Sequence, residues 1–239
     1  MSTLSKTDEI LSRTVLLVGD DIQKLINSHV AVFGLGGVGG YVCEILARAG
    51  VGTITIVDFD KVDVTNINRQ IIALNSTVGQ NKTDAILARI KDINPNIVVN
   101  VINDKLTQDN IDMFFSAKYD FVADCIDMVD SKVALIEACK DRDIHILSAM
   151  GAGNRVGVPN FEVKDIFDTY NDGLAKILRK KLRQKNINSA LCVHSIELPR
   201  KVNNTLGIRA IGSISYYPAM CGVYMGAVII NKLLEDKLC

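Results

Sequence analysis

Short apolar runs and amphipathic stretches alternate in the first part of the chain. Continuous apolar runs of strand length lie at residues 30–33 and 53–57, and residues 38–49 between them have helical spacing that ends at Gly50. Apolar runs without polar alternation are typical of strands that helices cover on both faces. This part of the chain therefore predicts a strand, a helix and a second, parallel strand.

The same alternation continues to about residue 150. Three further segments have helical spacing, at residues 81–93, 108–115 and 130–139. Three more strand-length runs accompany them, at residues 97–102, 121–123 and 144–148. Two short helices are expected before the first strand, at residues 10–19 and 21–27. Such alternation predicts a doubly wound sheet whose ligand binds at the carboxyl ends of the strands.

The pattern changes after residue 150. A glycine-rich loop is expected at residues 151–160 and a strand at 161–163, followed by a basic helix at 172–185 and another strand at 190–196. A polar loop then runs to about residue 205, and an apolar helix is expected at 217–238. We therefore predict an α/β fold, a doubly wound, mainly parallel Rossmann-like sheet with a C-terminal α+β extension. Residues 1–150 form the nucleotide domain with its N-terminal helices, and residues 151–239 extend the same globular unit.

Composition narrows the function classes. The chain has 27 basic and 27 acidic residues among 239, so any nucleic-acid or membrane partner must be bound by a local patch. Six cysteines without a C-x-x-C pair and three scattered histidines predict no zinc site and a reduced, cytoplasmic protein. The first ten residues have no apolar core, which argues against a signal peptide. We expect the apolar segment at residues 216–234 to be a buried helix rather than a membrane span.

The turn between the first strand and its helix carries the first chemical signal. It contains four glycines, which let backbone amides approach a phosphate, at Gly34, Gly36, Gly37 and Gly39. Asp58 ends the second strand, where a carboxylate accepts hydrogen bonds from ribose hydroxyls. The combination predicts a nucleotide site. The alternative is that the glycines serve only close packing of the helix on the sheet.

Residues downstream favour ATP over a nicotinamide cofactor. Three phosphate donors lie near the expected strand ends, at Asn66, Arg69 and Lys82. Asp127 follows a strand and can hold a divalent ion, and no acid–base pair for hydride transfer stands out. Arg13 lies outside the sheet, from where an arginine can reach a phosphate. Each of these residues alone has another explanation: Asn66 as a turn residue, Lys82 as a surface lysine, Asp127 as a helix-capping acid and Arg13 as a solvated arginine.

Four spaced motifs then resemble the adenylating domain of ubiquitin-activating-enzyme-like proteins, a family that includes the bacterial sulfur-carrier adenylyltransferases. They are GLGGVGG, DFDKVDVTNINRQ, VGQNKTD and DCIDMVDSK, and the resemblance covers about residues 10–150. It implies that ATP phosphates are contacted by Arg13, Asn66, Arg69 and Lys82. It also implies ribose binding by Asp58, an acidic rim at Asp60 and magnesium binding by Asp127.

The second half of the chain indicates the branch of that family. Residues 151–191 contain no cysteine, and Cys192 has the setting of a structural strand residue, which argues against a thioester enzyme. The whole chain resembles the bacterial tRNA threonylcarbamoyladenosine dehydratases, on RTVLLVG, MGAGNRVGVPNFEVKDI, LAKILRKKLRQKNI and GSISYYPAMCGVYMGAVIINKLL. This resemblance implies ATP-dependent cyclisation of the threonylcarbamoyl group on an adenosine near the tRNA anticodon, with release of AMP and pyrophosphate.

Three other functions remain open at this point. The main alternative is adenylation of the C-terminal glycine of a small sulfur-carrier protein on the same site. A nicotinamide-dependent dehydrogenase and a non-catalytic nucleotide-binding scaffold fit the glycine turn but leave the set of phosphate donors unexplained.

A cluster of positive charge on the predicted basic helix suggests how RNA is bound. Its members are Lys176, Arg179, Lys180, Lys181, Arg183 and Lys185. These side chains can contact tRNA phosphates, and the alternative is a solvated helix face. The patch is extended by Arg155, Arg200, Lys201 and Arg209. The resemblance also implies a homodimer, an accessory sulfur-transfer protein and a monovalent cation in the loop of residues 151–157.

Overall fold

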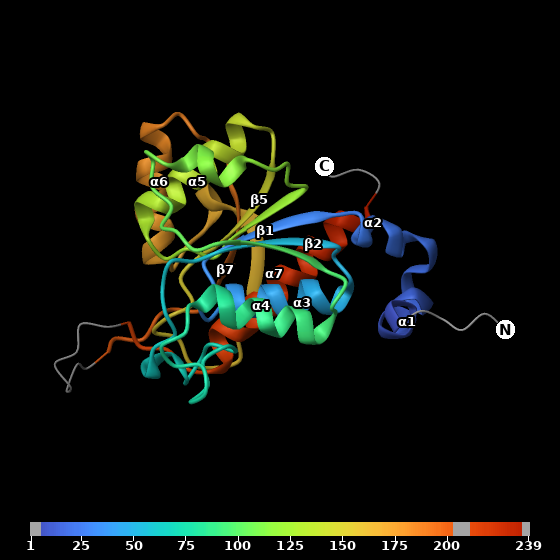
Figure 1. Ribbon diagram of the computed structural model, residues 1–239. Helices are drawn as coiled ribbons and strands as arrows, with labels where there is room; N and C mark the ends of the chain where they lie inside the picture. Colours follow the sequence, from blue (N-terminus) through green and yellow to red (C-terminus); the bar gives the residue numbers. More distant parts are fainter. Residues whose placement is uncertain (1–5, 203–210, 236–239) are drawn as a thin grey trace.

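One sheet crosses the computed structural model, which describes residues 6–202 and 211–235 (Figure 1). In these ranges seven strands lie in the order β3-β2-β1-β4-β5-β7-β6. All neighbours are parallel except β6 and β7, which are antiparallel. The strands are β1 (His29–Phe33), β2 (Thr53–Val57), β3 (Val98–Ile102), β4 (Phe121–Asp124), β5 (His145–Ala149), β6 (Phe161–Asp165) and β7 (Leu191–Ser195). The predicted α/β fold is confirmed.

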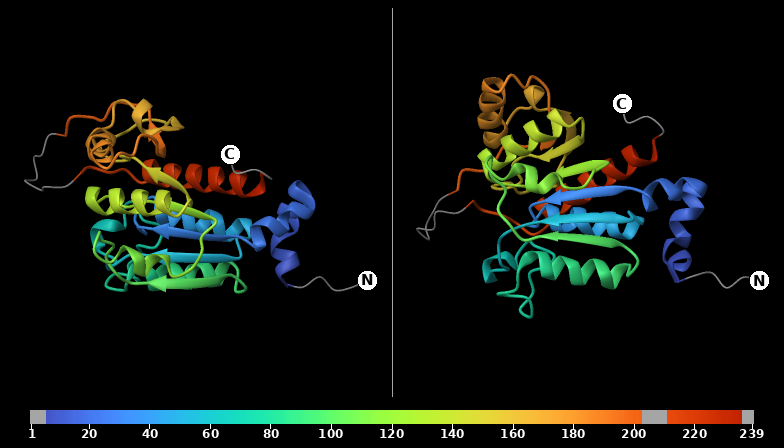
Figure 2. Two further views of the ribbon diagram at one scale, coloured as in Figure 1. Left: turned by 90° about the horizontal axis from the view of Figure 1, so that it is seen from above. Right: turned by 45° about the horizontal axis from the view of Figure 1, so that its top comes forward.

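Helices cover both faces of the sheet (Figures 1 and 2). α3, α4 and α7 lie on one face, and α5 and α6 lie on the other. The α-helices are α1 (Lys6–Val18), α2 (Ile22–Ile26), α3 (Gly39–Ala49), α4 (Lys82–Ile93), α5 (Val129–Asp141), α6 (Gly173–Gln184) and α7 (Tyr216–Leu234). Short 3-10 helices are η1 (Gly19–Asp21), η2 (Val64–Asn66), η3 (Ile111–Phe115) and η4 (Ile166–Asp168).

The packing of the central strand β1 explains why its sequence does not alternate between apolar and polar residues. Val30 and Val32 pack in the core beneath α3 and α7, whereas Ala31 and Phe33 pack in the core on the opposite face. Since successive side chains of a strand point to opposite faces, a strand covered on both sides must be apolar throughout.

Two predicted elements differ in detail. Residues 108–115 form only the 3-10 helix η3, because the Asn110 side chain accepts hydrogen bonds from the N–H and hydroxyl of Thr107 and folds the preceding residues into a turn. The last helix ends at Leu234, and residues 236–239 lie outside the described ranges, as do residues 203–205 of the predicted polar loop. Gly19, with φ of 58°, separates the two N-terminal helices as expected.

The apolar helix α7 is long enough to cross a membrane by length and composition. It packs instead along α3, with Cys221, Met225 and Ile229 in the core. Gly222 makes this close approach possible, because a Cβ there would lie 2.3 Å from the Val38 carbonyl oxygen. Its apolar composition is therefore that of a core helix, as predicted.

The strand order places a crevice beside β1. The chain leaves β1 towards β2 and β3 on one side and towards β4 and β5 on the other, so β1 and β4 flank the switch point. The sheet then continues from β5 into β7 and β6, which come from residues after 150. Loops from both parts of the chain thus meet at the carboxyl edge.

Candidate active site

The glycine turn after β1 is held in a shape that only glycine permits. Gly34 has φ of 86°, and a Cβ there would lie 2.8 Å from the Cys125 carbonyl oxygen. A Cβ on Gly39 would lie 1.8 Å from the Gly34 oxygen, so this glycine allows α3 to start directly against the turn. No side chain caps α3; at its start the Gly40 N–H donates to the Gly36 oxygen and the Tyr41 N–H donates to the Val38 oxygen.

Asp58 fixes this turn to the end of β2. Its carboxylate accepts hydrogen bonds from the Leu35 N–H at 2.7 Å and the Asp60 N–H at 2.8 Å. Burial raises the pKa of the Asp58 carboxyl, and the nearby Lys82 ammonium opposes this shift. A carboxylate has about four acceptor sites, so two remain for ribose hydroxyls.

Lys82 opens α4 and is nearly buried. Its ammonium lies 2.8 Å from Asp60 Oδ2 and 4.0 Å from Asp58 Oδ1. The Lys82 side chain is 8% exposed and the Asp60 side chain 50% exposed, so the pair lies at the boundary between core and solvent. In this structure Asp60 is the anion that Lys82 binds, and an incoming phosphate would replace it.

The turn after β2 presents two further donors. Asp63 accepts from the Thr65 N–H at 2.8 Å, and Asn66 Oδ1 accepts from the Asp63 N–H at 3.2 Å, a reciprocal cap that shapes η2. The Asn66 amide NH₂ keeps its two donors for a ligand. Arg69 donates through Nη1 to the Thr65 oxygen and to Asn68 Oδ1, which leaves the rest of its fork of N–H groups for a phosphate.

Asp127 lies in the turn between β4 and α5. Its side chain is exposed, and no residue in the described ranges binds its carboxylate. Magnesium is usually held by one or two carboxylates together with substrate phosphates, and it keeps several waters. A free carboxylate facing phosphate donors fits this ion, although no cluster of three or more His, Cys, Asp or Glu is present among the described residues.

These side chains surround one pocket at the carboxyl edge, with a volume of about 480 Å³. Of the predicted residues, its lining includes Gly34, Gly36, Gly37, Asp58, Asp60, Asn66, Arg69, Lys82 and Asp127. The second part of the chain contributes residues 149–153, Ile211, Ser213 and Pro218 to the lining. The pocket therefore combines a phosphate-binding turn, three cationic or amide donors and a free carboxylate, which suits transfer at a phosphoryl group.

Comparison with known proteins shows the family of this chain. Residues 11–238 match the ThiF family. The chain belongs to the ThiF family. The resemblance predicted from the adenylating motifs is thereby confirmed.

Two bacterial relatives are similar over most of their length. One is the tRNA threonylcarbamoyladenosine dehydratase of Bacillus subtilis, 39% identical over 240 residues, which cover 94% of each chain. Another is the enzyme of the same name from Haemophilus influenzae, 38% identical over 239 residues, which cover 93% of this chain and 92% of the relative.

Solved structures of the E. coli tRNA N6-threonylcarbamoyladenosine dehydratase TcdA are similar to this one. The complex with AMP has a TM-score of 0.90 at 32% identity and covers 98% of both chains. The complex with ATP has a TM-score of 0.87 at 31% identity and covers 98% of this chain and all of that one.

Two predicted residues of this ThiF-family chain do not line the pocket. Gly39 is buried behind the glycine turn, so its role is packing rather than phosphate contact. Arg13 is exposed on α1, and its neighbour Leu11 packs on Gly50 at the far end of α3. α3 has 11 residues and is about 16 Å long. Helix α1, which carries Arg13, lies at the edge of the sheet opposite the pocket (Figure 1).

A buried ion pair under the pocket was missed in the sequence. Lys132 Nζ lies 2.7 Å from Asp124 Oδ2, and both side chains are fully buried. Asp124 Oδ1 also accepts from the Ile126 N–H at 3.2 Å, which fixes the turn that carries Asp127. The available signal was a lysine directly before the apolar run of residues 133–136, because a buried lysine requires an acid.

Arg155 corrects part of the predicted RNA patch. It is 4% exposed, and its guanidinium donates to the backbone oxygens of Gly151, Asn171 and Glu197. Asp172 accepts from the Gly151 N–H at 2.9 Å, so the two side chains together fix the glycine-rich loop. The prediction that Arg155 binds RNA is wrong. The monovalent cation expected in this loop stays a prediction.

Most of the basic side chains of helix α6 already have partners within the protein. Arg179 donates to the oxygens of Ile166 and Thr169, and Arg183 lies 5.0 Å from the centre of the Phe167 ring. Lys181 pairs with Asp130 and Lys185 with Glu137, both on α5. Lys176 and Lys180 are exposed with no partner among the described residues, as are Arg200 and Lys201, while Arg209 lies outside them. RNA contact by this helix stays a prediction.

The cysteines do not provide a nucleophile in the described residues. Cys192 is fully buried, and burial raises the pKa of its thiol to about 12. Burial likewise raises the pKa of Cys221 to about 12 and that of Cys125 well above its ordinary value. Because the thiolate is the reactive form, these thiols are unsuited to thioester chemistry.

Proposed function

We propose that this protein activates a carboxylate with ATP, and that its substrate is tRNA bearing threonylcarbamoyladenosine, which it cyclises by loss of water. The observation that carries the proposal is the pocket at the carboxyl edge, where a glycine turn, Lys82, Arg69 and a free Asp127 face one space. The names of similar relatives over the full chain length give the substrate.

The chemistry needs no nucleophile from the protein. A substrate carboxylate attacks the α-phosphorus of ATP, pyrophosphate leaves, and a mixed anhydride with AMP forms. A second group of the same substrate then attacks the activated carbonyl carbon, and AMP departs with one carboxylate oxygen. Since the two groups belong to one molecule, proximity can supply about 7–11 kcal/mol of the barrier, so the scheme needs no reactive thiol, and the buried thiols of the described residues do not offer one.

Each side chain has a role in this scheme. Lys82, Arg69 and Asn66 bind phosphate oxygens and stabilise charge on the leaving pyrophosphate. Asp58 binds the ribose, and Asp127 holds magnesium, which neutralises the triphosphate when bound. Gly151 and Gly153 line the same pocket, so the loop after β5 can contact the substrate beside the nucleotide.

Mass analysis of tRNA tests the function. With ATP, the purified protein should convert tRNA taken from cells that lack it into a product whose modified nucleoside is lighter by one water, with AMP and pyrophosphate formed in equal amounts. Adenylation of a small sulfur-carrier protein, without a mass change in tRNA, would replace this proposal by the alternative of a carrier-activating enzyme.

Arg13 leads to a second part of the proposal. Within its own chain it lies near the far edge of the sheet, whereas a phosphate ligand must reach the pocket. Two exposed apolar side chains, Leu16 at 81% and Leu17 at 88%, lie on the same helix. We propose a homodimer in which Arg13 of one copy completes the pocket of the other.

Mixing two inactive variants tests this arrangement. Arg13→Ala leaves an intact pocket, and Asp127→Ala leaves an intact Arg13. After exchange of subunits, mixed dimers should contain one complete site and restore about a quarter of wild-type activity. If the mixture stays inactive although mixed dimers form, Arg13 does not act between copies.

The cellular compartment of the reaction is inferred from the relatives. The related enzymes are bacterial tRNA-modifying enzymes, and we propose that this protein works in the cytoplasm. An accessory sulfur-transfer protein stays a prediction from the family resemblance. A monovalent cation in the loop of residues 151–157 likewise stays a prediction from the resemblance.

A further inference from the structure

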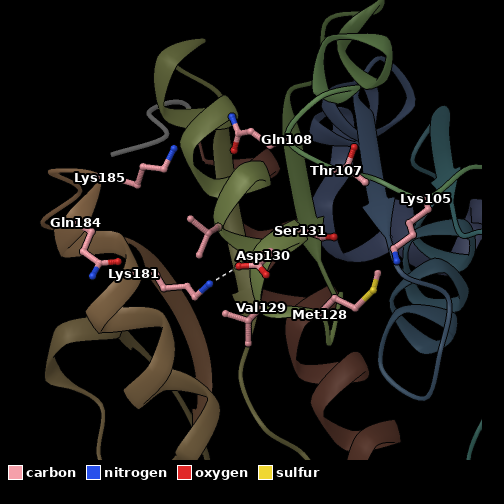
Figure 3. A pocket seen from close by; sticks show the side chains of 11 residues that line it. Lys105, Thr107, Gln108, Met128, Val129, Asp130, Ser131, Lys181, Gln184 and Lys185 are labelled. Atoms are coloured by element: carbon pink, nitrogen blue, oxygen red, sulfur yellow. Dashed lines mark hydrogen bonds and ion pairs between the residues drawn. The ribbon is translucent and has the colours of Figure 1, made fainter.

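A second pocket, of about 750 Å³, lies over the N-terminal half of α5 (Figure 3). Figure 3 shows side chains from the loop after β3 on one side and from α6 on the other, with α5 between them. The lining residues with polar ends are Lys105, Thr107, Gln108, Asp130, Ser131, Lys181, Gln184 and Lys185. Its volume is in the range of pockets that hold a small organic ligand, about 300–1,000 Å³.

This second pocket adjoins the nucleotide pocket. Met128 and Ser131 line both of them, and Met128 directly follows Asp127. The wall between them is the segment after β3, where Asp104 and Leu106 face the nucleotide pocket and Lys105 faces the second pocket. A chain lying in one pocket can therefore continue into the other.

The charge of the second pocket favours an anion. Three lysines and one aspartate line it, in a protein whose net charge is zero. Two of these lysines already have partners on α5: Lys181 pairs with Asp130, whose side chain is 87% exposed, and Lys185 pairs with Glu137, so solvent weakens both ion pairs. A phosphate can displace such a partner easily.

Its shape and remaining groups favour a nucleotide over a free phosphate. Met128, Val129 and Val133 form an apolar floor on which a base can lie. Gln108 and Gln184 stand on opposite sides, and their amides can donate to and accept from a base edge (Figure 3). Inorganic phosphate would use the lysines and leave this floor and both amides without a function.

We propose that the second pocket binds a nucleotide of the RNA substrate that flanks the reacting one, with its phosphates held by Lys105, Lys181 and Lys185. The inference rests on the proposed function and deepens it, because it assigns the RNA to one face of α6. Lys185 and Lys181 point to α5 and the pocket, whereas Lys176 and Lys180 are exposed elsewhere on the helix and do not line it.

Binding of tRNA to matched charge variants tests the proposal. Full-length Lys105→Ala/Lys185→Ala is compared with Lys118→Ala/Lys140→Ala, which removes the same charge from exposed positions outside both pockets. The probe is tRNA from cells that lack the protein. We expect roughly tenfold weaker binding for the pocket variant, a shallower dependence on salt, and unchanged ATP affinity. The control variant should bind as the wild type.

Asp130→Asn should change the affinity for tRNA in the opposite direction. Removal of the one acid in the lining should strengthen tRNA binding, an effect that loss of structure would not produce. Equal tRNA affinity of the pocket variant and the control would overturn the proposal and leave the function intact. A wild-type protein that forms AMP without any tRNA dependence would instead overturn the proposed function.

Discussion

Replacing Asp127 by Asn should reduce AMP formation by at least about 100–1,000-fold, and Arg69→Ala should do the same, because each removes a group that faces the triphosphate. Asp127 is the free carboxylate of the pocket, and Arg69 is the donor whose fork is only partly used. Release of AMP from ATP in the presence of tRNA measures both effects.

The fold should survive these two changes. Asp127 is exposed and has no partner among the described residues, so the melting temperature of Asp127→Asn should match that of the wild type. Asp109→Asn, another exposed acid outside both pockets, serves as the control and should keep full activity. Full activity in either the Asp127 or the Arg69 variant would contradict the assignment of the site.

Lys132→Ala should lower the free energy of unfolding by about 3–5 kcal/mol, because it leaves the Asp124 carboxylate buried without its counter-charge. Urea denaturation of the purified variant measures this loss. Activity should also fall, since Asp124 fixes the turn that carries Asp127 through the Ile126 N–H.

A double variant separates charge from packing. Asp124→Asn/Lys132→Met removes both charges and keeps the volume of the lysine stem, so it should be considerably more stable than Lys132→Ala. If Lys132→Ala loses less than about 1 kcal/mol, the pair does not stabilise the turn as its burial indicates.

The strands and the pocket could be predicted because their signals are local. Apolar runs marked β1 and β2, glycines marked the turn, and donors at strand ends had to converge at one edge of a parallel sheet. Lys82 and Asp127, far apart in sequence, line one pocket for this reason.

The sequence pattern gave no sign of the partners of two buried cations. Arg155 has the appearance of a surface cation, and only the fold shows that it binds backbone oxygens up to 42 residues away. The acid that pairs with Lys132 lies on strand β4, whereas Lys132 lies on helix α5, so the pattern of neither element alone indicates the pair. Arg13 lies away from the pocket of its own chain, and its contact with a phosphate stays a prediction.

The contact between Lys82 and Asp60 has a consequence for the energetics of nucleotide binding. Because Lys82 already carries an anion from its own chain at 2.8 Å, the protein supplies a resident counterion to its most buried cation in the pocket. A triphosphate that binds there exchanges one carboxylate for a phosphate and releases no salt anion from this position. The affinity for the triphosphate should therefore depend less on ionic strength than the number of cations suggests. Asp60 can also bind Lys82 again as the nucleotide leaves.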